Sequence, residues 1–90
     1  MFDLELVPVL REDIIYREND SVIFDTINGK LIELSDSAND IISAVQDGRN
    51  VLNIIDDMHM IYDESSYEEV TGFVCEFITE LMTSGIIESR

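Results

Sequence analysis

The hydrophobic pattern of this 90-residue chain changes its period near residue 35. Before that point, β-branched and aromatic residues form short runs bounded by polar or glycine-containing turns, which is typical of β-strands. After it, apolar residues recur every three or four positions, which is typical of helices that bury one face. The pattern therefore predicts a small sheet followed by helices.

Three runs in the first part are predicted to be strands: residues 14–17, 21–25 and 30–34. The dipeptide Asn28-Gly29 lies between the second and the third, and it strongly favours a tight hairpin turn. Polar residues 18–20 form the earlier turn. We therefore predict a three-stranded antiparallel meander, which needs a second layer to cover its apolar face.

Three helices are predicted in the second part. Ser35 is a good N-cap for the first helix, which ends at Asp47-Gly48, and Asn50 is a good N-cap for the second. The third helix is the longest and runs from about residue 66 to residue 84, and residues 86–88 are predicted to follow it as a short extended tail. The expected order β-β-β-α-α-α is that of an α+β, winged helix-turn-helix fold in a single domain that spans the whole chain.

The third helix carries the side chains that we expect to divide between the core and the surface. The stripe predicted to face the core consists of Val70, Phe73, Phe77 and Leu81. Val74 and Ile78 lie beside this stripe, where they can line a surface groove. On this prediction, a Val74→Asp substitution changes the groove and leaves the fold almost intact.

The charge of the chain argues against two classes of partner. There are 20 acidic and 5 basic residues, for a formal net charge of −15. Binding to nucleic acid or to an anionic membrane uses clustered lysine and arginine, and the few cations here are scattered along the sequence. We therefore expect neither kind of partner. The single cysteine and the absence of a signal peptide or a membrane-length apolar run favour the cytoplasm.

No catalytic or metal site is predicted. Cys75 and His59 are the one cysteine and the one histidine, and they fall on different predicted helices. A nucleophile without a neighbouring base is not activated, and a zinc site needs several such ligands. The many carboxylates are best explained as solvated helix faces. We expect a protein that is not an enzyme and that holds no cofactor.

One short motif offers an alternative. The segment Asp36-Ser37-Ala38 resembles the Asp-Ser-Leu site of acyl carrier proteins, in which the serine carries phosphopantetheine. Ala38 replaces the leucine of that site, and strands are predicted where a carrier protein has its first helix. The competing interpretation is that Ser35 and Ser37 satisfy free amide groups of the first helical turn.

The chain as a whole resembles the PqqD family. In the first half the resemblance rests on Phe24-Asp25, the run from Gly29 to Ser35, Ala38, Ile41 and Asp47-Gly48. In the second half it rests on Arg49-Asn50-Val51, Ile54-Ile55, the run from Phe77 to Leu81, and Gly85-Ile86-Ile87. Together these segments cover roughly residues 8–88, in the order and spacing typical of the family.

The resemblance implies a stand-alone recognition element for a ribosomally synthesised precursor peptide. Proteins of this kind bind the leader segment of the precursor and present it to a modifying enzyme, often a radical S-adenosylmethionine enzyme. The leader is expected to pair as an added strand on the third strand, at Lys30, Leu31, Ile32, Glu33 and Leu34. The wall contributed by the third helix is expected to be Tyr67, Val70, Thr71, Val74, Cys75 and Ile78.

The predicted sheet is itself suited to this mode of binding. An outer strand carries unpaired backbone groups that act as a template for strand addition, by a peptide or by a second copy of the chain, so a homodimer is also possible. The excess of acidic residues favours a leader, or a patch on the enzyme, that is basic.

Overall fold

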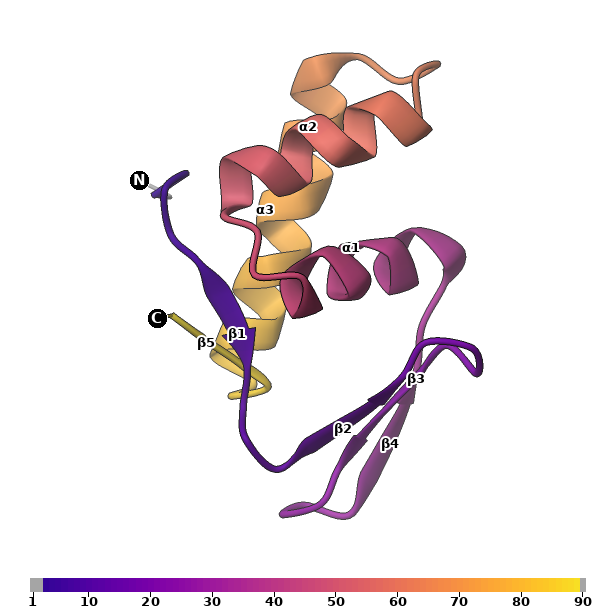
Figure 1. Cartoon of the computed structure of the whole chain (residues 1–90), viewed down its shortest axis with the longest axis vertical. Helices are drawn as coiled ribbons and strands as arrows, with labels where there is room; N and C mark the ends of the chain where they lie inside the picture. The colour runs from indigo at the N-terminus through magenta and orange to yellow at the C-terminus, as the bar shows by residue number, and fades with distance from the viewer. Residues whose placement is uncertain (1–2, 90) are drawn as a thin grey trace.

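The computed structural model describes residues 3–89 of the chain. Its elements are β1 (Pro8–Leu10), β2 (Ile14–Arg17), β3 (Val22–Asp25), β4 (Lys30–Glu33), α1 (Asp36–Gln46), α2 (Val51–Ile61), α3 (Tyr67–Thr83) and β5 (Ile87–Ser89). Figure 1 shows β2, β3 and β4 as a layer below the helices, with α3 running down behind α1 and α2. The predicted α+β class, with three antiparallel strands followed by three helices, is confirmed.

The sheet of β2, β3 and β4 is the meander that the sequence predicts. β3 is the central strand, and its Ile23 stands opposite Tyr16 in β2 and Ile32 in β4. Asn28-Gly29 lies in the turn between β3 and β4, where Gly29 has a φ of 66°, a left-handed conformation that glycine adopts without strain. β2 and β4 are therefore the outer strands of this sheet.

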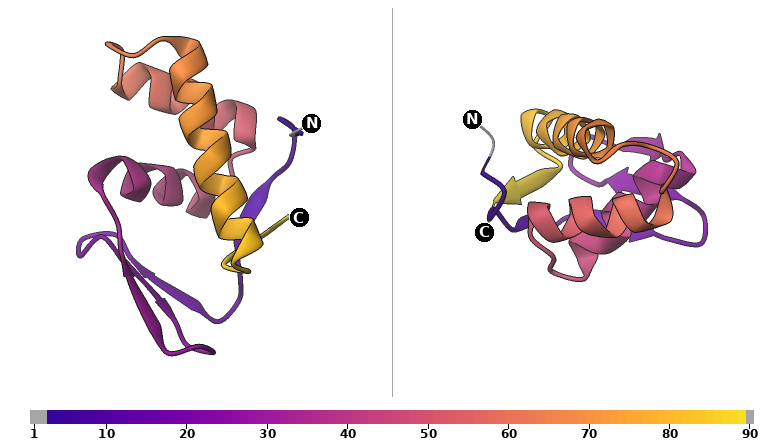
Figure 2. Two further views of the ribbon diagram at one scale, coloured as in Figure 1. Left: turned by 180° about the vertical axis from the view of Figure 1, so that it is seen from behind. Right: turned by 90° about the horizontal axis from the view of Figure 1, so that it is seen from above.

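The structure contains a second, two-stranded sheet that the predicted order of elements does not include. β1 and β5 pair antiparallel, with Val9 opposite Glu88. β5 overlaps the segment 86–88 that the sequence indicates as an extended tail, whereas β1 has no counterpart in the prediction. Three residues that include Pro8 are too few to show a strand period, and proline argues against a strand interior. Figures 1 and 2 show β1 and β5 side by side, so two segments that are far apart in the sequence lie next to each other.

The helices begin and end where the sequence predicts. The side chains of Ser35 and Asn50 accept hydrogen bonds from backbone amides in the first turns of α1 and α2. Ser66 and Glu69 form a reciprocal capping box at the start of α3. Gly48 and Gly85, which follow α1 and α3, both have a φ of 78°. Local capping chemistry therefore fixes where all three helices begin and where α1 and α3 end.

The core lies between the inner face of the sheet and the three helices. It is built largely of fully buried isoleucines, among them Ile23, Ile41, Ile42, Ile54, Ile55, Ile78 and Ile87. Tyr16 ties the sheet to α1, because its hydroxyl donates to the side-chain oxygen of Asn39 at 2.6 Å. No helix within residues 3–89 is both long enough and apolar enough to cross a membrane.

The buried stripe of α3 differs from the predicted one. Val74 and Ile78 are 0% exposed, whereas Phe73 is 41% exposed and Phe77 is only partly buried. The assignment of Phe73 to the core and of Val74 to a groove is therefore wrong. The reason is that the phenylalanine stripe is flanked by Glu69, Glu76 and Glu80, so the apolar face of α3 is centred on its aliphatic residues.

Candidate functional site

β4 leaves one edge of the three-stranded sheet open. The backbone N–H of Leu34 donates to the carbonyl of Ser21 at 2.8 Å, so the backbone groups of Leu34 point toward β3. Because these groups alternate in direction along a strand, Ile32 also faces β3, whereas Leu31 and Glu33 face away from it. Within residues 3–89, no further strand pairs with that edge. The N–H and C=O groups of Leu31 and Glu33 are therefore available to another strand.

A lower cleft lies beside this edge, between the β3–β4 hairpin and the C-terminal end of α3. Its volume is about 420 Å³, and it is lined by Asp25, Asn28, Lys30, Ile32, Glu80, Leu81, Ser84 and Ile86. Its apolar side chains come from both walls, and Lys30 and Glu80 bring opposite charges to it. In the left view of Figure 2, α3 descends toward the level of this hairpin. A strand added to β4 would place every second side chain toward this cleft.

An upper cleft of about 340 Å³ lies at the N-terminal end of α3. It is lined by Ser37, Tyr62, Ser65, Glu69, Val70 and Phe73. Glu69 and Phe73 are followed at helical spacing by Glu80 and Ser84, so the upper and lower clefts open on the same face of α3. From Glu69 to Glu80 the helix rises about 16 Å, which corresponds to about five residues of an extended strand.

A polar cluster holds the hairpin against the end of α3. Arg11, in the loop between β1 and β2, donates to the carboxylates of Asp13 and Asp25 and, at 3.0 Å, to the carbonyl of Gly85. Asp25 also accepts from the side chain of Asn28 at 2.8 Å. Gly85 follows α3 and Asn28 lies in the β3–β4 turn, so a single guanidinium joins the two walls of the lower cleft.

Hydrogen bonds keep the carboxylates of this cluster charged. Donation by Asn28, together with the positive charge of Arg11, lowers the pKa of Asp25, although burial of this carboxylate acts in the opposite direction. The bond from Arg11 lowers the pKa of Asp13 to about 2. Both groups are therefore ionised near neutral pH, and the cluster serves to hold structure in place. It has no group that is poised to donate or accept a proton.

The residues predicted to form the peptide-binding edge lie on β4 and directly after it. In β4, Lys30 and Ile32 point toward the lower cleft, whereas Leu31 and Glu33 point to the opposite face of the sheet. Leu34 follows β4 and packs against the core. The edge and the lower cleft therefore share residues 30–32.

The residues predicted to form the helix wall do not share one surface of α3. Three of them are buried, and the other three lie on the side of α3 that faces α2. Val70, Val74 and Ile78 are buried, and of these only Val70 also borders the upper cleft. Val74 and Ile78 are enclosed by other core side chains, so the expectation that they line a surface groove is wrong.

The other three predicted wall residues lie on the α2 side of α3. The hydroxyl of Tyr67 donates to Asp56 of α2 at 2.9 Å, and Thr71 and Cys75 follow at i+4 and i+8 on the same side. The surface that α3 does present to the two clefts includes Phe73, Glu80 and Ser84, which the sequence-based prediction did not select for the wall.

The residues with nucleophilic or metal-binding chemistry lie apart. Burial raises the pKa of the half-buried Cys75 thiol, which makes it less reactive. His59 packs edge-on against the ring of Tyr67, with ring centroids 5.4 Å apart. Ser37 lies in the first turn of α1, with its hydroxyl 3.3 Å from that of Ser35. Within the described part of the chain, no group of three or more His, Cys, Asp or Glu residues could hold a metal ion.

A comparison with protein-family models finds a match over most of the chain. Residues 20–87 match the family model described as "Coenzyme PQQ synthesis protein D (PqqD)". This range begins just before β3 and includes the open edge of β4, all three helices and both clefts. No curated protein and no solved structure gives a significant match.

Proposed function

Because the chain belongs to the PqqD family, whose members recognise precursor peptides as accessory binding proteins rather than as catalysts, we propose that it binds the leader of a ribosomally synthesised precursor peptide. The leader pairs as an added strand on β4 and lies in the groove between β4 and α3. The protein then presents the bound precursor to a modifying enzyme, and a radical S-adenosylmethionine enzyme is a suitable type.

The open edge of β4 is the observation that carries this proposal. Leu31 and Glu33 present backbone groups that pair with no strand in the described part of the chain, and the lower cleft lies directly beside them. Main-chain pairing tolerates many sequences, whereas the pockets beside the strand select side chains. The arrangement therefore suits a peptide that is recognised in an extended form.

The side chains of the leader, rather than its backbone, are expected to determine the affinity and selectivity of binding. Four backbone hydrogen bonds to Leu31 and Glu33 contribute about 0.5–1.5 kcal/mol each. Ordering five leader residues costs about 1–2 kcal/mol for each of them, so the backbone contribution at best roughly offsets this cost. Apolar leader side chains that become buried in the clefts contribute about 1.5–3 kcal/mol each and must supply the affinity. Two or three such side chains, at alternate positions, can contact Ile32 and Leu81 in the lower cleft and Phe73 in the upper one.

The charge of the protein favours a basic leader or a basic surface on the enzyme. The net charge is −15, and the cleft face of α3 carries Glu69 and Glu80. Surface charge of one sign raises the association rate of partners with the opposite sign. The same acidity argues against nucleic acid as the partner of this fold.

The remaining assignments follow from the order of the elements. We assign residues 1–90 to one PqqD-like domain of the winged helix-turn-helix type, because α2 and α3 pack together beside a three-stranded meander. The carrier alternative gains no support at Ser37, because β2, β3 and β4 precede α1 where a carrier protein has a helix.

A titration followed by NMR tests the proposed function. The isotope-labelled protein is titrated with the leader peptide of a candidate precursor encoded near its gene, and a scrambled peptide of the same composition serves as the control. We expect the amide signals of residues 30–34 and of Phe73, Glu80 and Ser84 to move with the leader only. Binding that leaves these signals in place would contradict the proposed site, and the absence of binding would contradict the function.

A further inference from the structure

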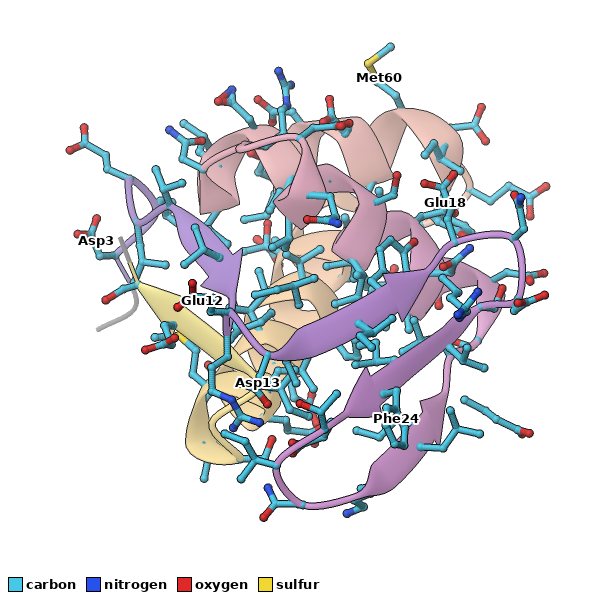
Figure 3. The ribbon with its side chains drawn as sticks, turned by 60° about the horizontal axis from the view of Figure 1, so that its bottom comes forward. Asp3, Glu12, Asp13, Glu18, Phe24 and Met60 are labelled. Carbon is cyan, nitrogen blue, oxygen red and sulfur yellow. The ribbon has the colours of Figure 1, made fainter. Side chains whose placement is uncertain are left out.

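The face of the three-stranded sheet that turns away from the helices carries a row of exposed apolar side chains. Ile15, Phe24 and Leu31 stand directly opposite one another, one on each strand, and are 45%, 38% and 58% exposed. Figure 3 shows Phe24 on the near side of the sheet, with the helices behind it. Contiguous apolar surface of this kind indicates an interaction site, and neither the core nor the two clefts use this row.

The neighbouring row on the same face carries charge. It consists of Arg17, Val22 and Glu33, which again stand directly opposite one another. A two-fold rotation about an axis parallel to β3, lying in the plane of this face, exchanges β2 with β4. It brings Arg17 of each copy opposite Glu33 of the other, and Ile15 opposite Leu31. The two rows are therefore self-complementary, which is what a two-fold symmetric interface requires.

We propose that this outer sheet face binds the same face of a second copy of the chain, so that the two sheets pack against each other in a symmetric dimer. The ion pairs found among residues 3–89 involve the arginines Arg11 and Arg49, so Arg17 is available to pair with the Glu33 of another copy. This pairing is the charge complementarity that selects a second copy over an unrelated apolar surface. The inference does not depend on the proposed peptide-binding function.

Salt should strengthen this dimer. Each copy carries a net charge of −15, which opposes association over long range and is screened as the ionic strength rises. A face of three short strands buries less than about 1,200 Å² in total, which is the range of weak and transient contacts. We therefore expect association at high-micromolar concentrations. Packing through the face leaves the open edge of β4 uncovered.

Sedimentation equilibrium tests the proposal at about 0.05 M and about 0.5 M NaCl, between which the Debye length falls from about 14 Å to about 4 Å. For the unaltered protein we expect the average mass to rise toward that of two chains, and to rise further at the higher salt concentration. Phe24→Lys places a charge at the centre of the interface and should raise the dissociation constant at least about tenfold, because a charge buried without a partner is unfavourable. Met60→Lys is the matched control, since Met60 is exposed on α2, far from this face, and the charge change is identical.

A charge-reversal series separates this face from any other site of self-association. Arg17→Glu alone should weaken the dimer, because it opposes like charges, and Arg17→Glu combined with Glu33→Arg should restore it without changing the net charge. Thermal unfolding of each variant shows whether the fold is retained. The proposal is overturned if the unaltered protein stays monomeric at about 1 mM in the higher salt, if Phe24→Lys dimerises normally, or if the double variant fails to recover.

Discussion

Replacing Leu31 with proline tests strand addition on β4 without disturbing the sheet. The backbone N–H of Leu31 points to the open edge, as inferred from the hydrogen bond that joins Leu34 to Ser21. Proline removes this N–H and breaks no bond of the β3–β4 ladder, and proline is tolerated on an edge strand when the missing donor faces outward. The folded protein should therefore retain its stability to within about 1 kcal/mol.

Leader binding should respond strongly to the same substitution. A leader carbonyl that loses its partner in the groove costs about 1–3 kcal/mol. At about 1.4 kcal/mol for each factor of ten, the dissociation constant rises by about 5-fold to 150-fold. Calorimetric titration of the leader at low-micromolar protein measures this change, and urea unfolding measures the stability.

Two control variants make the Leu31→Pro result interpretable. Leu31→Thr alters the same side chain but keeps the N–H, so it should bind the leader nearly as well as the unaltered protein. Ile32→Pro removes an N–H that faces β3, so it should lower the free energy of unfolding by about 1–3 kcal/mol. If Leu31→Pro folds normally and binds the leader as tightly as Leu31→Thr does, then the leader does not pair with β4.

Two further predictions follow from the core and from the polar cluster. Val74→Asp should lower the free energy of unfolding by about 3 kcal/mol or more in a urea titration, because it buries an unpaired polar group in the core. Phe73→Asp should instead remain folded and weaken leader binding in the same calorimetric assay. Equal destabilisation of the two variants would contradict the placement of α3. Since the folded-state pKa of Asp13 is lowered to about 2, its bond to Arg11 stabilises the fold above the unfolded-state pKa of about 4 and ceases to do so as the pH falls toward 2. The difference in melting temperature between the unaltered protein and Arg11→Gln should therefore be constant from pH 7 to about pH 5 and shrink below that, whereas a constant difference down to pH 2 would show that the charge of Asp13 is not involved.

Those parts of the fold that depend on local chemistry could be predicted from the sequence. The Asn28-Gly29 turn and the caps at Ser35 and Asn50 each involve residues only a few positions apart, so the sequence contains the whole interaction. The open edge at β4 followed from the same reasoning, because a meander of three strands always has two outer strands. The pairing of β1 with β5 joins the two ends of the chain and has no local signal.

The assignment of α3 side chains needed information that the apolar pattern alone does not supply. Val70 and Leu81 belong to two possible stripes, one completed by Phe73 and Phe77 and the other by Val74 and Ile78. The glutamates beside Phe73 favour the second stripe, and weighting the charged residues would have identified it. The Arg11 cluster could not be predicted in this way, because it joins residues as far as 74 positions apart.

Amide hydrogen exchange at single-residue resolution tests the central claim most directly. In the free protein the N–H groups of Leu31 and Glu33 face the open edge, whereas that of Ile32 faces β3. Binding of the leader as an added strand should slow exchange at Leu31 and Glu33 strongly and change exchange at Ile32 much less. Equal protection of all three amides, or no protection of Leu31 and Glu33 in a saturated complex, would contradict binding by strand addition.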